Sequence, residues 1–229
     1  MCEKNFSLKL STPSSFPPPL LQTVHFRGQI RFSNRNVLRQ RILFKLIGSN
    51  VVHNFTRSPG LSSSDLRERI FFMLYSQEKT EEAILQLNRV IKQMPKNSQA
   101  FALKAYALNR LANTRQEWMY SKHALEYADR ALVLNPNDDI ALTSKGWALI
   151  DLGKAEEALM PLKQATKVNP NNEYAWYNLA WAQYLTGDAG ASRESITRAR
   201  QISPGNAIIK QGKWMMQKGQ IPDHLKKKT

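Results

Sequence analysis

The sequence predicts an all-α protein built as an array of helical hairpins, and two observations carry this prediction. The first is an internal repeat: residues 139–170 and 173–204 can be superimposed at a constant spacing of 34 residues, which aligns Pro170 with Pro204. A fixed period of this size is typical of stacked supersecondary units. The second is the helical spacing of the apolar residues, which indicates two short amphipathic helices in each copy.

The two helices of a copy are predicted to cross closely. In the copy 139–170, the two apolar faces consist of Leu142, Gly146 and Leu149, and of Ala158, Leu162 and Ala165. Gly146 and Ala158 mark the crossing, because larger side chains there would force the helix axes apart. The prolines that close each copy stop the second helix, and nearby Asn or Asp can cap the next one.

Spacing, small residues and helix breakers together resemble the tetratricopeptide repeat, a helix–turn–helix unit. The resemblance covers roughly residues 64–218. It implies a right-handed α-solenoid of about four helix-turn-helix repeats with a C-terminal capping helix, because a solenoid needs a terminal element to shield its last repeat.

We expect the solenoid to occupy residues 62–220. Its predicted repeats are 62–95, 98–136, 139–170 and 173–204, followed by a capping helix at 207–218.

The first repeat departs from the pattern, because Phe71 stands where a small residue belongs. The second is seven residues too long, which is about two helical turns, so we expect a projecting hairpin around 113–120. Pro161 falls inside a predicted helix and predicts a local bend.

The basic charge is concentrated at the front of the chain. Residues 1–60 carry a net charge of +8, and the other 169 residues carry +7. We expect 1–61 to be a disordered basic leader; an organelle-targeting segment, a misassigned start with Met73 as the next methionine, and a segment that contacts membrane or nucleic acid are alternatives. Residues 221–229 form a basic tail.

No uncharged apolar run reaches about 18 residues, so no membrane-spanning helix is expected.

Catalytic motifs are missing from the sequence. It contains no phosphate-binding glycine loop, no paired-cysteine zinc pattern and no nucleophile elbow. The four histidines are scattered, and Cys2 is the lone cysteine, which fits a reducing compartment. We therefore expect a non-enzymatic protein without cofactor or metal. We expect it to be intracellular, either cytoplasmic or, if the leader is a transit peptide, organellar.

The resemblance also implies which residues face a partner. In the family, the second, fifth, ninth and twelfth positions of each first helix line a concave groove. These positions are Gln99, Ala102, Tyr106 and Asn109 in the second repeat, Ile140, Thr143, Trp147 and Ile150 in the third, and Tyr174, Tyr177, Trp181 and Tyr184 in the fourth. The predicted partner-binding residues are Tyr106, Trp147, Ile150, Tyr174, Tyr177, Asn178, Trp181 and Tyr184. Asn178 matches one position of the family's carboxylate clamp, but Ala102 and Thr143 do not supply its basic residues.

Three residues close to these positions are predicted to be structural. Trp176 occupies the family's usual core position. Lys104 and Lys145 precede the small residue of their helices, and we expect their stems to pack while the ammonium groups reach water.

These predictions favour a scaffold or assembly factor that binds an apolar or aromatic-containing protein segment in an aromatic groove. One alternative is a binder of nucleic acid or anionic surfaces that uses the basic leader and tail. A second alternative is a homo-oligomerising scaffold.

Overall fold

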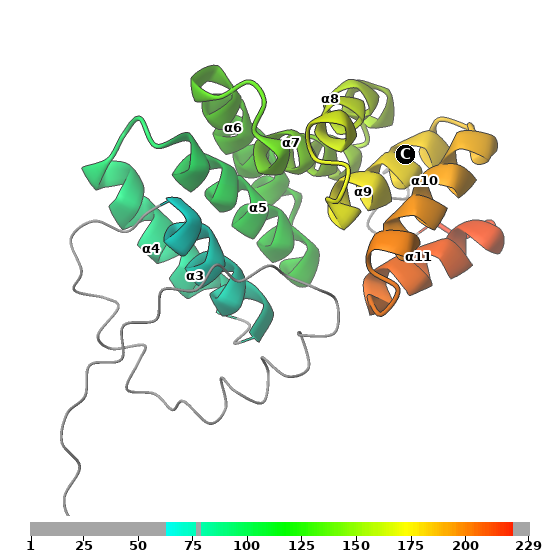
Figure 1. The fold of residues 1–229 in the computed structure, drawn as a ribbon, viewed down its shortest axis with the longest axis horizontal. Coiled ribbons are helices and arrows are strands. Elements are labelled where there is room, and N and C mark those ends of the chain that lie inside the picture. Colours follow the sequence, from blue (N-terminus) through cyan, green and yellow to red (C-terminus); the bar gives the residue numbers. More distant parts are fainter. Residues whose placement is uncertain (1–62, 77–78, 222–229) are drawn as a thin grey trace, which may run out of the picture. The chain divides into compact units, whose positions relative to one another are not determined.

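The computed structural model describes residues 63–76 and 79–221, all of which lie in one compact unit, residues 47–229. The predicted leader and all of the tail except residue 221 lie outside the described residues. Nine helices and no strand occur in the described part (Figure 1). They are α3 (Ser63–Ser76), α4 (Thr80–Gln93), α5 (Ser98–Arg115), α6 (Trp118–Leu134), α7 (Asp139–Asp151), α8 (Ala155–Val168), α9 (Glu173–Leu185), α10 (Ala189–Ile202) and α11 (Ala207–Gln217).

The helices pack as four successive hairpins and a terminal helix. Each of the pairs α3–α4, α5–α6, α7–α8 and α9–α10 is in contact, and each hairpin also contacts the next one along the chain. Among the first helices, α5 contacts α7 and α7 contacts α9, as a stacked array requires. This arrangement confirms the predicted all-α helical-repeat fold.

The helix starts follow from capping residues near the predicted boundaries. The side chains of Asn97, Asp138, Asn172, Asp188 and Asn206 each accept a hydrogen bond from a backbone N–H in the first turn of the helix that follows. Such caps satisfy N–H groups that have no partner within the helix. Local residues thus determine the starts of five of the nine described helices, and prolines follow the ends of the second helices.

The crossing of α7 with α8 is as close as the small residues predict. A Cβ atom built on Gly146 would lie 2.3 Å from Cγ of Leu162, far inside contact distance. One repeat later, the Ser192 hydroxyl of α10 donates a hydrogen bond of 2.9 Å to the Ala180 carbonyl of α9. The position shared by Gly146 and Ala180 is therefore covered by the second helix of the same repeat.

The extra residues of the second repeat lengthen both of its helices. Helix α5 has 18 residues and α6 has 17, compared with 13 for α7 and 14 for α8. The chain turns at Gln116, whose φ of 58° is left-handed. Trp118, just past this turn, is 46% exposed.

Helix α8 runs through Pro161, and the predicted bend there stays a prediction. At the end of the array, α11 buries Ile209 against α9 and α10 residues. Its Gly212 lies against the Tyr177 ring, because a Cβ there would be 2.6 Å from Cε2 of that ring. None of the helices in the described ranges has the length and apolarity to cross a bilayer.

Candidate functional site

Five aromatic rings from all four repeats meet along the first helices. We call Phe71 and Tyr75 of α3, Tyr106 of α5, Trp147 of α7 and Tyr174 of α9 the N-terminal ring cluster. Their contacts run Phe71–Tyr106 at 5.4 Å, Tyr106–Trp147 at 5.8 Å, Tyr106–Tyr174 at 6.3 Å and Tyr75–Tyr174 at 6.3 Å between ring centroids. These distances lie in the range of favourable aromatic pairs.

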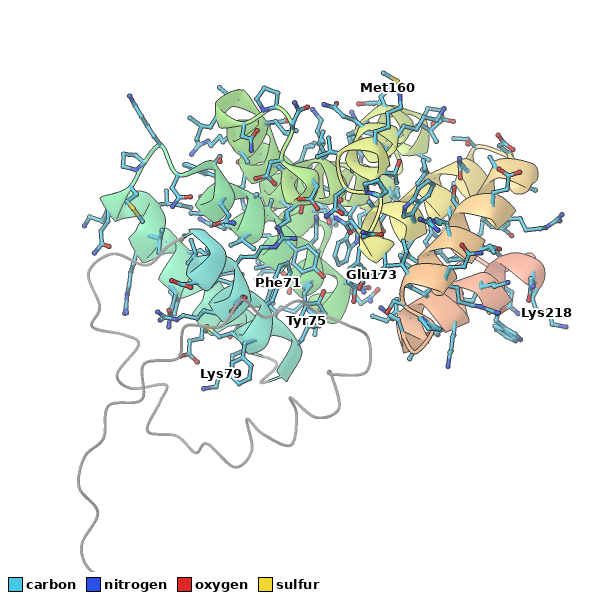
Figure 2. The ribbon with its side chains drawn as sticks, in the orientation of Figure 1. Phe71, Tyr75, Lys79, Met160, Glu173 and Lys218 are labelled. Atoms are coloured by element: carbon cyan, nitrogen blue, oxygen red, sulfur yellow. The ribbon has the colours of Figure 1, made fainter. Side chains whose placement is uncertain are left out.

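Polar contacts hold the first helix of the array within this cluster. The Tyr75 and Tyr106 hydroxyls are hydrogen-bonded to each other. Arg110 donates to the Leu74 carbonyl at 3.2 Å and places its guanidinium 4.6 Å from the centre of the Tyr75 ring. Tyr75 and Tyr174 belong to the first and fourth repeats, so the rings join repeats that a plain solenoid would keep apart. Figure 2 shows Phe71, Tyr75 and Glu173 in the same region, between α3 and α9.

A second group of rings lies further along α9. We call Tyr177, Trp181 and Tyr184 the C-terminal ring cluster. Trp181 makes edge-on contacts with Tyr177 at 6.4 Å and with Tyr184 at 5.8 Å between ring centroids. Met215 and Met216 of α11 pack against the buried residues around Trp181. Trp181 is therefore only 3% exposed.

The predicted partner-binding residues divide into two groups by burial. Tyr106, Ile150, Asn178 and Trp181 are buried, whereas Trp147, Tyr174, Tyr177 and Tyr184 are half-buried. The expected contrast on α9 is reversed. Trp176, predicted as core, is only partly buried and its indole N–H donates to the Pro170 carbonyl at 3.0 Å. Trp181, predicted to face a groove, is the buried ring, because the neighbouring rings and α11 cover it.

Most of the other predicted groove positions are also covered. Ala102, Asn109, Ile140 and Thr143 are buried, and only Gln99 keeps partial exposure. Asn109 donates from Nδ2 to the Ser144 carbonyl at 2.8 Å and so links the second repeat to the third. The Thr143 hydroxyl donates to the Asp139 carbonyl at 2.6 Å. Asn109 thus stabilises the stacking of α5 on α7, whereas the Thr143 bond lies within α7.

Sequence reasoning missed the contribution of α3 and of Arg110. Tyr75 follows Phe71 by four residues, as Tyr184 follows Ala180, so it stands at a groove position of the first repeat. The rule that selected Tyr184 would have selected Tyr75 if it had been applied to this irregular repeat. Arg110 gave no such signal, because its role depends on the approach of α3 to α5.

Lys104 also differs from expectation. It is buried, and its ammonium lies 3.7 Å from the centre of the Tyr127 ring rather than in water. A cation over an aromatic face replaces part of the lost hydration. Lys145 behaves as predicted, because its partly exposed ammonium reaches Asp129 at 2.7 Å.

Burial dominates the electrostatics of the first helices. It raises the pKa of Tyr106 well above its ordinary value, and it also raises the pKa of Tyr174, Tyr177 and Glu173. At the end of α7, burial raises the pKa of Asp151 to about 7, although hydrogen bonds from Ser121 and Trp147 oppose the shift. The described residues contain no group of three or more His, Cys, Asp or Glu side chains that could hold a metal ion.

These features define the class of the molecule as a helical-repeat protein of the α-solenoid type. Residues 145–207 match the tetratricopeptide repeat model, so this part of the chain consists of tetratricopeptide repeats. No curated protein matches the sequence.

Solved structures show the same fold. A tetratricopeptide-repeat protein of Thermus thermophilus is similar with a TM-score of 0.60 at 15% identity, covering 81% of this chain and 99% of that one. MamA of Desulfovibrio magneticus RS-1, from residue 41 to its end, gives a TM-score of 0.51 at 20% identity, covering 71% of this chain and 87% of that one. This fold supports protein–protein interaction scaffolds in general.

Proposed function

We propose that the protein is a non-enzymatic scaffold or assembly factor that binds an apolar or aromatic-containing protein segment along its first helices. The observation that carries this proposal is the set of partly exposed rings that the first, third and fourth repeats contribute. They are Tyr75, Trp147, Tyr174, Tyr177 and Tyr184, and we call them the first-helix surface.

The two ring clusters adjoin on one helix, which supports a continuous binding surface. Tyr174 and Tyr177 are three residues apart on α9 and therefore neighbours on its surface. Tyr and Trp rings provide a large contact area with little loss of rotamer freedom, and they dominate binding energy where they are well supported. The buried Tyr106 and Trp181 hold the outer rings in place, so a partner would meet a rigid surface.

The test begins with selection of binding segments from a library of displayed peptides, using the full-length protein as bait. We expect the selected peptides to be rich in aromatic and large aliphatic residues. Tyr184→Ala should weaken their binding by about 10- to 30-fold, as loss of an aromatic anchor does. Trp118→Ala is the matched control, because that ring is 46% exposed but lies on the hairpin tip of the second repeat.

Two outcomes would contradict the proposal. One is that no peptide is selected reproducibly. The other is that Tyr184→Ala and a further variant, Tyr177→Phe/Trp147→Phe, bind every selected peptide as wild type does while keeping the wild-type helical signal. The second variant retains aromatic rings but removes the Tyr177 hydroxyl and the Trp147 indole N–H, which is hydrogen-bonded to Asp151. It should keep the fold at some cost in stability and weaken binding by a smaller factor.

A further inference from the structure

Trp214 on α11 occupies a position that is covered in the preceding repeats. Gly146, Ala180 and Trp214 are separated by 34 residues each, so they share one place in the repeat. In the third and fourth repeats the second helix crosses at this place, as the contacts of Gly146 with Leu162 and of Ala180 with Ser192 show. Trp214 has no such helix over it among the described residues, and its side chain is 52% exposed.

Two lysines frame this ring. Lys210 precedes Trp214 by four residues and Lys218 follows it by four, at the end of α11, so the three side chains share one helical face. Both lysines are exposed. Figure 2 shows Lys218 at the outer edge of the molecule beside α11. We call Lys210, Trp214 and Lys218 the α11 face.

The α11 face belongs to a basic part of the described chain. Residues 189–221 contain six Lys or Arg and a single acid, Glu194. Residues 63–76 and 79–188, by contrast, contain fifteen basic and fourteen acidic residues and are almost neutral. The ion pairs found in the described ranges involve Lys79, Arg115, Lys145 and Lys154, and none involves the six basic residues of 189–221.

We propose that the α11 face binds an acidic amphipathic helix of a partner protein. The place of Trp214 in the repeat is one where a helix packs, which favours a helical occupant. The indole would contact the apolar stripe of that helix, and Lys210 and Lys218 would pair with carboxylates beside the stripe. Because Trp214 stands where a close crossing needs Gly or Ala, the occupant lies further from α11 than a second helix does within a repeat. Long side chains such as Leu and Glu can span that distance.

A nucleic acid fits this face less well. Binding of single strands uses several aromatic side chains that stack successive bases along a basic channel. On the α11 face there is one ring, Trp214, which is 52% exposed. A single ring flanked by two lysines suits the apolar stripe and carboxylates of an acidic helix better than a run of bases.

The test measures binding of a labelled synthetic helix to the full-length protein by fluorescence anisotropy. The probe is about 18 residues long, which permits several helical turns, with Leu at helical spacing and Glu elsewhere. A second probe carries Lys in place of every Glu. We expect the Glu probe to bind and the Lys probe not to bind. Trp214→Ala and Lys210→Glu/Lys218→Glu should each weaken binding of the Glu probe at least about tenfold.

Two matched controls separate this site from general attraction to a basic protein. Trp118→Ala removes an equally exposed ring that also lies beside a lysine, Lys122, at 4.2 Å from the ring centre. Lys163→Glu/Lys167→Glu reverses two exposed charges on α8. Both controls should bind the Glu probe within about twofold of wild type.

Several results would overturn the proposal. Equal loss of binding in the controls would mean that net charge alone attracts the probe. Binding of the Lys probe, or no binding of the Glu probe, would exclude an acidic helix as the occupant. If Trp214→Ala lost binding to a single-stranded RNA of about 20 nucleotides but not to the Glu probe, the face would be a nucleic-acid site. Tyr184→Ala should leave binding of the Glu probe unchanged, so this proposal and the proposed function can fail separately.

Discussion

Gly146 and Trp214 stand at the same place in their repeats, yet their surroundings are opposite. Gly146 is so close to Leu162 that not even a Cβ atom fits. Trp214 carries the largest side chain and leaves half of it in solvent. The difference lies in the neighbour: α8 crosses α7 at Gly146, whereas no described helix crosses α11 at Trp214. The burial of a repeat position therefore depends on its neighbour: the position is covered inside the array and exposed on the terminal helix.

The largest effect is expected when a large side chain replaces Gly146 at the interior position. Gly146→Leu should lower the free energy of unfolding by about 3 kcal/mol or more, because the new side chain would overlap Leu162, which is itself fully buried. Urea denaturation followed by circular dichroism measures the loss.

Lys145→Leu is the control for that variant. Its partly exposed ammonium pairs with Asp129, and a pair of this kind contributes at most about 1 kcal/mol. The control should stay within about 1 kcal/mol of wild type. Equal destabilisation by both substitutions would show that α7 is rotated relative to the crossing described here.

Most of the fold could be predicted from the sequence because its determinants are local. Prolines end the second helices, and Asn or Asp caps start the helices that follow, so their bounds come within a few residues of the predicted ones. The small residues at the crossing could be read from the period alone. The seven extra residues of the second repeat lengthened α5 and α6, as their match to two helical turns predicts.

The burial of the site residues could not be predicted in the same way. The period tells which side of a first helix is inner, but not how tightly successive hairpins wind. That winding brings Tyr75 of the first repeat to Tyr174 of the fourth, and it covers Tyr106 with rings from other repeats. Trp181 is covered by α9 neighbours and by methionines of α11, which a single-repeat pattern does not contain. Long-range contacts decide such burial.

A second prediction concerns Asp151, the last residue of α7 and five residues beyond Gly146. Burial raises the pKa of Asp151 to about 7, above its ordinary value of 3.8. The folded state therefore binds the proton more tightly than the unfolded state does, and the contribution of Asp151 to stability falls as pH rises from about 4 to about 7. Asp151→Asn should raise the free energy of unfolding by about 1–2 kcal/mol at pH 8 and change it little at pH 4.

Ser121→Ala sharpens the assignment. The Ser121 hydroxyl donates to Asp151 at 3.2 Å and opposes the rise of its pKa. Its removal should move the fall in stability to higher pH, which urea titrations between pH 4 and pH 8 would detect. Parallel stability curves for wild type and Asp151→Asn across this range would exclude Asp151 as the titrating group.

The smallest effect on stability is expected at the exposed end of the comparison. Trp214→Ala removes a ring that is half in solvent, and it also places a good helix former in α11, so the free energy of unfolding should change by less than about 1 kcal/mol. Trp181→Ala, measured beside it, should cost about 3–5 kcal/mol, because that ring is 3% exposed and truncation leaves a cavity. Thermal melts and urea titrations on both variants measure the two losses of unfolding free energy. A loss at Trp214 close to the loss at Trp181 would mean that the ring supports the end of the array rather than presenting a free surface, and an acidic helix would then have no anchor on α11.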